Sequence, residues 1–336
     1  MTALVYNRGV PVQKRPPARE GVNDHVVSSA RELLATLRPE PATWAGDPLK
    51  WIFRGHADAA WELKPKAVRG GGVALTAFFH DMPPPSPGTA ITWNERKSRH
   101  DALIERFRQG LHRSGLTVPV ESPPVTEPPM IARAMSQPSR WSLPVVALAQ
   151  HHGLPTMLMD WSRRPLVAAY FAAEDVVMSG RRRRQSDYMA VWALENTQGW
   201  PSEPFRSRPL VYEPPGDTNP NLHAQAGLFT EHPAPFTAND GDEDVALDVY
   251  LSLVARKWPR PELRRYFLHR AEALQLLRLL AFEGVTGASL FPNPDGVARG
   301  LREEALWRTL DKGESRKPLA RLAELRSGFT GDELRR

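Results

Sequence analysis

Residues 149–173 read AQHHGLPTMLMDWSRRPLVAAYFAA, and the hydrophobic pattern changes twice along this stretch. Residues 141–152 have the pattern of a helix, and Gly153 is a residue type that commonly ends one. Residues 156–159 follow as a short strand candidate, and residues 165–174 as an apolar helix with a proline in its first turn. This alternation predicts an α+β or mixed α/β core.

The other periodic segments extend this pattern in both directions. Residues 29–32 carry a capping-box pattern ahead of three leucines, and residues 51–55 form a compact strand signal that ends at a glycine. The remaining expected helices are residues 101–111, 264–282 and, in the tail, about 319–325; the segment 264–282 has the clearest helical period. The remaining expected strands are residues 188–194, 210–212 and 228–230. We therefore expect an α+β fold with a mixed sheet, flanking helices and Pro-rich insertions.

The prolines indicate how the chain is divided. The chain has 33 prolines among 336 residues, about twice the usual share of roughly 5%, so many connections are expected to be Pro-stiffened loops. We expect an N-terminal arm with a short helix (1–45), a core domain (46–301) and a charged C-terminal tail (302–336). Within the core domain, loop insertions are expected near residues 80–95, 117–140 and 197–245.

The composition excludes several classes of protein. The chain has no cysteine, which removes disulfides, Cys-ligated zinc, iron–sulfur clusters and thiol catalysis. No apolar run approaches the roughly 18 residues of a membrane span, and residues 1–21 lack the features of a signal peptide. We therefore expect a soluble cytoplasmic protein with no membrane contact. The net charge of +6 leaves a nucleic-acid partner open.

Three segments place reactive side chains beside predicted strand or helix ends. Arg54 ends a strand beside Gly55 and His56, so its guanidinium can bind a phosphate or carboxylate ligand, or pair with a structural carboxylate. Asp160 can act as a general base or cap the next helix. Gln225 can present its amide to a sugar hydroxyl or satisfy a buried backbone group. From the residues alone, these alternatives stay open.

Two histidines stand beside each other in the second of these segments. His151 and His152 are at a helix end, where adjacent side chains point in different directions. They are a poor pair of ligands for one metal ion, and no HExxH-like spacing supplies a further ligand. We expect no metal site. A hydrolase or nuclease that uses both histidines with Asp160 is one alternative function.

The three segments resemble the FRG domain family, which is named for its Phe-Arg-Gly triplet. The triplet stands at residues 53–55, and residues 149–171 are similar to the family pattern AQHxGLPTRLLDWT followed by a helix with AxYFA. Residues 224–230 and 284–296 resemble later motifs of the family. The resemblance spans roughly residues 48–301 in scattered blocks.

The order of these motifs is also similar to that of ADP-ribosyltransferases, which use NAD as a substrate. Those enzymes begin with a strand that carries Arg or His beside Gly, continue with a Ser/Thr strand and a helix rich in alanine and aromatic residues, and end with a strand that carries Glu or Gln. The residues that follow this order are Arg54, Gly55, Thr156, Tyr170, Phe171 and Gln225. The resemblance implies a toxin or phage-defence effector with a macromolecular acceptor and a neutralising antitoxin or regulatory partner.

Cleavage of NAD passes through an oxocarbenium-like state, and a site for it has defined needs. Arg54 can hold the pyrophosphate, and aromatic rings can enclose the nicotinamide. Gln225 can bond the ribose 2′-hydroxyl but cannot stabilise positive charge. Either a carboxylate, Asp160 or Glu231, does so, or turnover is slow, or the protein only binds the nucleotide. The candidate catalytic residues are Arg54, Thr156, Asp160 and Gln225, and the candidate NAD-binding residues are Arg54, Gly55, His56, Trp161, Tyr170 and Phe171.

A non-enzymatic nucleic-acid-binding or regulatory module is the main alternative. It rests on the net charge and on four consecutive arginines, Arg181, Arg182, Arg183 and Arg184. Such a run either contacts phosphates or belongs to a solvated loop.

Overall fold

The computed structural model of the protein describes residues 14–38, 40, 44, 47, 49–79, 92–119, 143–178, 185–196, 211–214, 219–231, 246–254 and 261–311. Within these residues the core is one sheet of seven strands in the order β1-β7-β4-β2-β3-β6-β5. The strands are β1 (Asn23–Val27), β2 (Trp51–His56), β3 (Leu158–Ser162), β4 (Tyr188–Glu195), β5 (Val211–Tyr212), β6 (Gly227–Glu231) and β7 (Leu263–His269). β1 and β7 are parallel, and the other neighbouring pairs are antiparallel. The expected α+β class with a mixed sheet is therefore confirmed.

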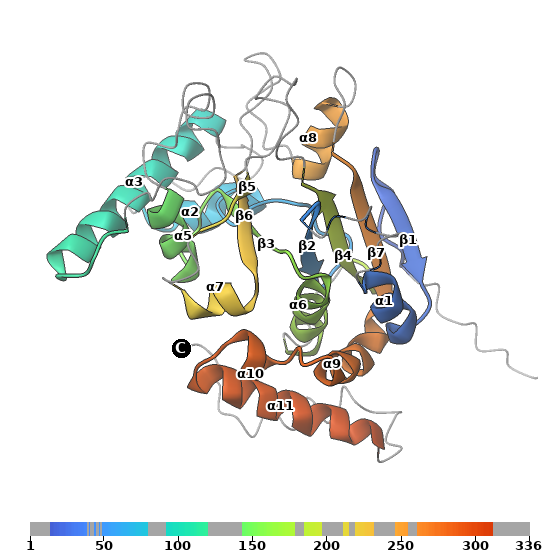
Figure 1. The fold of residues 1–336 in the computed structure, drawn as a ribbon. Helices are drawn as coiled ribbons and strands as arrows, with labels where there is room; N and C mark the ends of the chain where they lie inside the picture. Colours follow the sequence, from blue (N-terminus) through green and yellow to red (C-terminus); the bar gives the residue numbers. More distant parts are fainter. Residues whose placement is uncertain are drawn as a thin grey trace, which may run out of the picture.

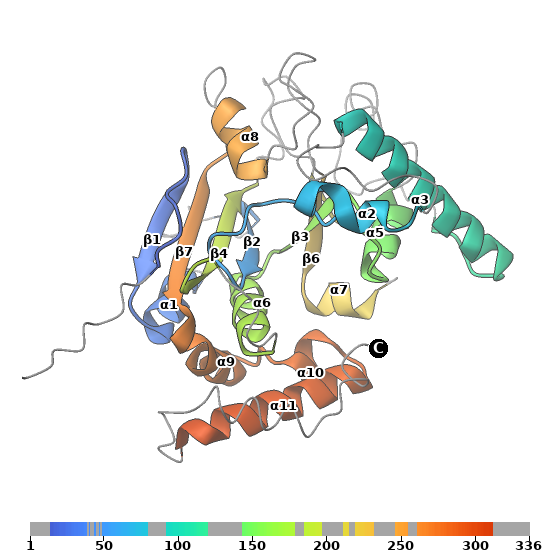
Figure 2. The ribbon, with the colours of Figure 1, turned by 180° about the vertical axis from the view of Figure 1, so that it is seen from behind.

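Helices cover both faces of this sheet, as Figures 1 and 2 show from opposite sides. The longer helices are α1 (Ala30–Leu37), α3 (Trp93–Arg113), α5 (Leu143–His151), α6 (Pro165–Met178), α8 (Leu247–Val254), α9 (Ala273–Phe282) and α11 (Pro294–Asp311). The short ones are α2 (Val73–Thr76), α7 (Pro220–Ala224), α10 (Gly287–Leu290) and the 3₁₀ turns Arg69–Gly72 and Arg270–Glu272. α1, α6 and α9 pack on one face, and α8 packs on the other. α3 and α5 pack beside β3 and β6.

The contact between β2 and α6 is unusually close because of one glycine. A Cβ atom on Gly55 would lie 2.0 Å from the carbonyl oxygen of Ala168 and 2.7 Å from the amide nitrogen of Ala172. Both distances are far below van der Waals contact, so any other residue here would push the helix away from the strand. The glycine of the triplet therefore lets α6 pack directly on the strand that carries Arg54.

The expected helix over residues 264–282 is wrong in its first part. Leu263–His269 form β7, and α9 begins only at Ala273. Arg265 lies on this strand with its side chain fully buried, and its guanidinium bonds the Asp24 carboxylate at 2.8 and 2.9 Å. A buried arginine obscures the alternation of apolar residues that marks a strand, and its carboxylate partner is distant in the sequence.

Two other expected elements have different bounds in the structure. The strand expected at residues 156–159 lies at Leu158–Ser162, which places Asp160 and Trp161 on β3. The helix expected at residues 101–111 begins earlier, at Trp93. The side-chain oxygen of Thr92 accepts a hydrogen bond from the amide of Glu95 and so caps that helix.

Both ends of the described chain join the core. β1 lies in the expected N-terminal arm and pairs in parallel with β7. α11 continues past residue 301, and Leu306 packs in the core. The insertions expected near residues 80–95, 117–140 and 197–245 lie largely outside the described residues, as do residues 312–336 of the expected tail. In the part of the chain that is described, no helix combines the length and apolarity that a membrane crossing requires.

Candidate functional site

A cavity of about 860 Å³ lies between β2, β3, α5 and α6 and is closed by the α7–β6 turn and by Phe291. This volume falls within the range of roughly 300–1,000 Å³ that is typical of ligand pockets. The cavity brings together most of the expected site residues: Arg54, Gly55, His56, Asp160, Trp161, Phe171 and Gln225. Side chains from four separate regions of the sequence therefore face one space.

Arg54 is the basic centre of this cavity. Its side chain is 13% exposed, and one terminal nitrogen, Nη1, lies 3.5 Å from the Asp160 carboxylate. The same nitrogen donates to the backbone oxygen of Asp160. Burial lowers the pKa of Arg54 from its ordinary value, and the Asp160 charge opposes that shift. The guanidinium stays charged at neutral pH, because arginine titrates far above it.

Asp160 is the acidic counterpart on β3. Its side chain is 65% exposed, and one carboxylate oxygen accepts a hydrogen bond of 2.6 Å from the amide of Gln150. The hydroxyl of Thr156 donates to the other end of that amide, Oε1 of Gln150, and accepts from the backbone N–H of Leu158. Thr156 is fully buried and does not line the cavity. Its contacts fix Gln150, which in turn orients the carboxylate.

His56 lies beside Arg54 and is 4% exposed. Burial is the main cause that lowers the pKa of His56 well below its ordinary value. The positive charges of Arg54, Arg69 and Arg19 act in the same direction. The ring is therefore neutral at neutral pH, and it can accept a hydrogen bond but adds no charge to the cavity.

Aromatic side chains form much of the remaining wall. Trp161 lines the cavity, and its indole N–H donates to Thr230 at 2.9 Å, which holds the ring in place. Phe171 also lines it and packs edge-on against Phe291, with ring centroids 6.1 Å apart. Tyr170 does not line the cavity: it is fully buried, and its hydroxyl donates to Glu303 at 2.5 Å. Of the three expected stacking residues, Trp161 and Phe171 therefore face the ligand space.

Gln225 lies on the cavity wall but its amide is engaged. The side-chain nitrogen donates to the backbone oxygen of Leu290 at 3.1 Å, which ties the α7–β6 turn to α10. The backbone oxygen of Gln225 accepts from the hydroxyl of Ser162. Ala226, next in the chain, has a φ of 44°, a strained value for a residue with a Cβ. The turn is thus held in an unusual backbone conformation beside the cavity.

Among the cavity residues that sequence reasoning missed, two polar ones bear directly on the candidate site, Gln150 and Arg69. Gln150 stands within the resemblance at residues 149–171, but no pattern shows which of its neighbours it contacts. Arg69 begins the 3₁₀ turn Arg69–Gly72 and lines the cavity. The positions of Gln150 and Arg69 beside the cavity follow only from the fold, which brings β2, β3 and residues 61–72 together.

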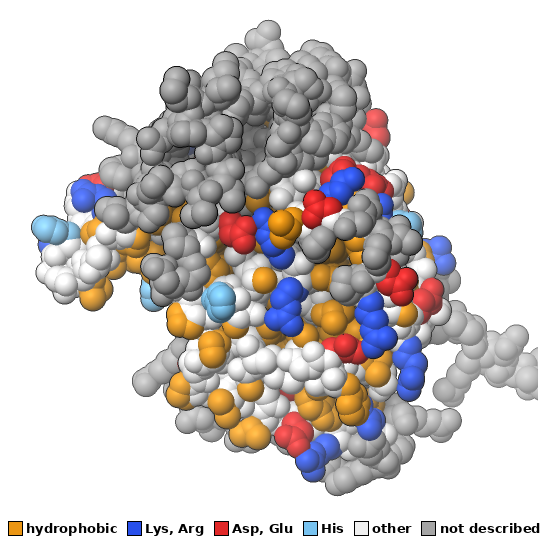
Figure 3. Space-filling view, viewed as in Figure 1, with side chains coloured by type: hydrophobic (Ala, Val, Ile, Leu, Met, Phe, Trp, Pro, Cys, Tyr) orange, Lys and Arg blue, Asp and Glu red, His pale blue; other side chains and the backbone are white. Residues whose placement is uncertain are grey.

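The alternative sites have less support. His151 lines the cavity, whereas His152 packs against Phe107 with ring centroids 6.5 Å apart. In the described part of the chain, no three His, Asp or Glu side chains are arranged to hold a metal ion. The four consecutive arginines at 181–184 lie outside the described residues. On the part of the face in Figure 3 that is described, Lys and Arg side chains are interspersed with Asp and Glu.

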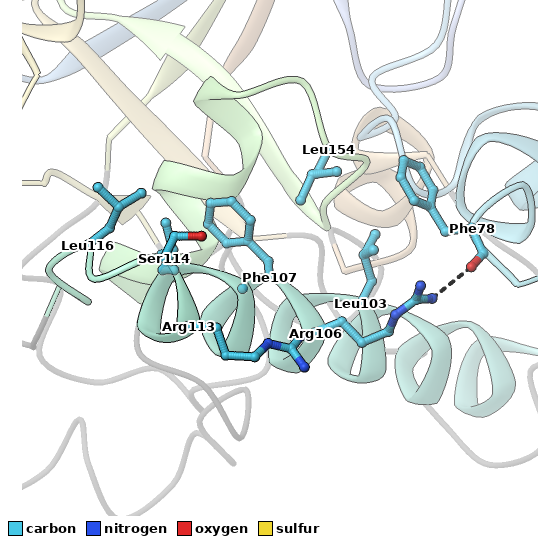
Figure 4. A pocket seen from close by; sticks show the side chains of 10 residues that line it. Phe78, Leu103, Arg106, Phe107, Arg113, Ser114, Leu116 and Leu154 are labelled. Atoms are coloured by element: carbon cyan, nitrogen blue, oxygen red, sulfur yellow. Dashed lines mark hydrogen bonds between the residues drawn. The ribbon is translucent and has the colours of Figure 1, made fainter.

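A second, smaller hollow of about 420 Å³ runs along α3 (Figure 4). Leu103, Phe107 and Leu154 form its apolar wall, and Arg106 donates to the backbone oxygen of Phe78 at 2.8 Å beside it. None of the expected catalytic or NAD-binding residues lines this hollow. We therefore place the candidate site in the larger cavity.

Comparison with known proteins gives one match. A search of curated proteins and a search of solved structures found no similar protein. The family model of the FRG domain matches residues 49–179. This segment includes the triplet at 53–55 and the stretch at 149–173, but not the later motifs at 224–230 and 284–296. Residues 49–179, which supply Arg54, Asp160 and Phe171 to the cavity, therefore identify this chain as a protein with an FRG domain.

Proposed function

We propose that the cavity binds an NAD-type dinucleotide and that the protein cleaves the bond between nicotinamide and ribose. The observation that carries this proposal is the Asp160 carboxylate. It faces the cavity with a fixed partner on each side, Arg54 at 3.5 Å and Gln150 at 2.6 Å. The order of motifs similar to that of ADP-ribosyltransferases supports the same reaction.

The reaction needs a carboxylate of this kind. When the bond between C1′ of ribose and the nicotinamide nitrogen breaks, its electron pair leaves with nicotinamide and C1′ becomes positively charged. A carboxylate held close to C1′ stabilises that charge, and fixed partners keep it from reorganising during the reaction. The oxygen of water, or a nucleophilic group of an acceptor, then bonds C1′ and releases its proton to solvent.

Asp160 suits this role better than Glu231 does. Glu231 ends β6 and is not among the residues that line the cavity. Burial raises the pKa of Glu231, and the nearby Asp101 acts in the same direction while Lys97 opposes it. A carboxylate that is harder to ionise and lies away from the cavity is a weaker stabiliser of positive charge.

We extend the proposal to transfer of ADP-ribose to a macromolecule. The Asp160 side chain is 65% exposed, so the reacting carbon beside it would be open to a group of a second molecule. Such a transferase would suit a toxin or defence effector that a partner protein neutralises. Radiolabelled NAD mixed with cell protein and RNA would identify the acceptor.

The test is release of nicotinamide from NAD by the purified full-length protein, followed by chromatography. We expect release with the wild type and a rate reduced by about 100-fold or more in Asp160→Asn, the usual cost of a lost electrostatic stabiliser. Glu304→Gln is the matched control, because Glu304 on α11 pairs with Arg308 and does not line the cavity, and it should retain the wild-type rate. The proposal fails if the wild type releases no nicotinamide with or without acceptor, or if Asp160→Asn retains full activity.

A further inference from the structure

The second arginine of the cavity has no role in the function proposed above. Arg69 lines the same cavity as Arg54, and its Nε donates to the backbone oxygen of Lys64 at 2.9 Å. This contact holds the base of the guanidinium. Among the described residues, no carboxylate oxygen lies within ion-pair distance of Arg69, and the residue is exposed, so its two terminal amino groups are open to a ligand.

The charge of one carboxylate, Asp160, acts on both Arg54 and Arg69. Arg54 pairs with Asp160 at 3.5 Å, and the charge of Asp160 also acts on Arg69. Burial first, and the charge of Arg54 second, lower the pKa of Arg69 to about 10, which leaves it protonated at neutral pH. Two positive groups face one negative group at this end of the cavity, and a bound anion would balance the excess charge.

The other carboxylates of the wall are not among the groups whose charge acts on Arg54 or Arg69. Glu174 and Asp175 line the cavity from α6, and Glu174 forms an ion pair with Arg299 at 3.2 Å. Burial raises the pKa of Glu174, an effect that Arg299 opposes. Asp160 is therefore the carboxylate that acts on both arginines, whereas Glu174 pairs with Arg299.

We infer that Arg54 and Arg69 together form a diphosphate-binding site, in which each guanidinium binds one phosphoryl group of a nucleoside diphosphate moiety. A guanidinium presents a planar pair of N–H donors that matches two phosphate oxygens. Arg54 comes from β2 and Arg69 from the 3₁₀ turn Arg69–Gly72, and both line the same cavity, so the two linked phosphoryl groups of a diphosphate can each meet one guanidinium. The inference deepens the proposed function and rests on the same cavity.

Binding of nucleotides to the full-length protein by titration calorimetry tests this inference. We expect ADP to bind more tightly than AMP, and AMP more tightly than adenosine, with an affinity for ADP that falls as salt is added. Arg69→Ala should weaken ADP binding by about tenfold or more and leave adenosine unchanged. Arg69→Lys keeps the charge but loses the planar pair of donors, and it should bind ADP with intermediate affinity.

Arg308→Ala is the matched control, because Arg308 is 70% exposed on α11 and pairs only with Glu304 among the described residues. The control should bind ADP as the wild type does. The inference is overturned if AMP and ADP bind equally, or if Arg69→Ala binds ADP with unchanged affinity. ADP carries no nicotinamide, so this result is independent of whether the protein cleaves NAD.

Discussion

Nε of Arg54 lies 3.1 Å from Nε2 of His56, and the indole N–H of Trp192 lies 3.2 Å from the opposite ring nitrogen of His56. Arg54 and His56 share one side of β2, because residues two apart on a strand point the same way. A neutral imidazole has one nitrogen that accepts and one that carries a proton. With N–H donors at both ends of the ring, an added proton on His56 would be repelled.

His56 should therefore make the protein sensitive to acid. The pKa of His56 is depressed in the folded protein, so the unfolded chain takes up its proton first as the pH falls below about 6.5. Stability that is present above this pH is lost on acidification, with a slope of at most about 1.4 kcal/mol per pH unit for one group. Urea unfolding at a series of pH values between neutral and acidic measures the slope.

His56→Gln isolates this contribution. Glutamine does not titrate, so the pH slope of the variant should be shallower than that of the wild type below pH ~6.5. The pKa of His151 is also lowered, by burial and by His152, but that contribution is common to both proteins and cancels in the difference. Equal slopes in the two proteins would show that His56 is not the group that titrates.

Gly55→Ala should destabilise the protein severely. The new methyl group would lie 2.0 Å from the backbone oxygen of Ala168, and backbone atoms cannot move aside as a flexible side chain can. We expect a loss of about 3 kcal/mol or more in the free energy of unfolding. Gly110→Ala in α3 has nothing within 4 Å of the new methyl group and should stabilise by about 0.5–1 kcal/mol. Denaturant unfolding measures the free energy of unfolding of both variants. The prediction is contradicted if this free energy changes in the same direction in both.

Thr156→Val should reduce stability and activity together. Valine keeps the shape but removes the hydroxyl that donates to Gln150 and accepts from Leu158, which leaves a buried N–H without a partner at a cost of about 1–3 kcal/mol. Gln150 then loses the contact that directs it to Asp160, so nicotinamide release should also fall. Thr156→Ser retains both hydrogen bonds and should restore both properties. Restored stability with no recovery of nicotinamide release would argue against a positioning role.

Phe171 and Tyr170 are neighbours on α6 that should respond differently. Phe171 lines the cavity, so Phe171→Ala should raise the KM for NAD by about tenfold through loss of ring contact. Tyr170→Phe removes only the hydroxyl that donates to Glu303, so it should cost about 1–3 kcal/mol of stability with an unchanged KM. If KM rose in Tyr170→Phe but not in Phe171→Ala, the nicotinamide would lie on the Tyr170 side of α6.

The sequence predicted those parts of the fold whose signals are local. The helix at Ala30–Leu37, the strand at Trp51–His56 and the helix at Pro165–Met178 follow from capping, apolar period and a first-turn proline. The strand β7 was missed because it contains Arg265, whose burial depends on Asp24 and on backbone oxygens of Ala59 and Pro17. No window of local sequence contains those partners.

In the candidate site, too, local signals could be predicted from the sequence and tertiary contacts could not. Arg54, Asp160 and Phe171 could be selected by residue type and position beside element ends. Whether a side chain points into the cavity or into the core could not be predicted. Neighbours on a helix, such as Tyr170 and Phe171, differ in this respect only because different residues pack against them. The approach of Arg69 to Arg54 depends on the path of residues 57–68, a segment without regular secondary structure.

Among the described strands, β7 is the last along the chain, yet it lies between β1, the first, and β4. During synthesis, residues 23–27 therefore have no partner strand until residues 264–268 have left the ribosome. Pairing across such a sequence separation slows folding. The segment 49–179 contains β2 and β3 but neither β4 nor β7, and Phe291 completes the cavity wall. A nascent chain consequently carries no assembled site, and whatever chemistry the cavity performs begins only after translation has passed this last wall residue.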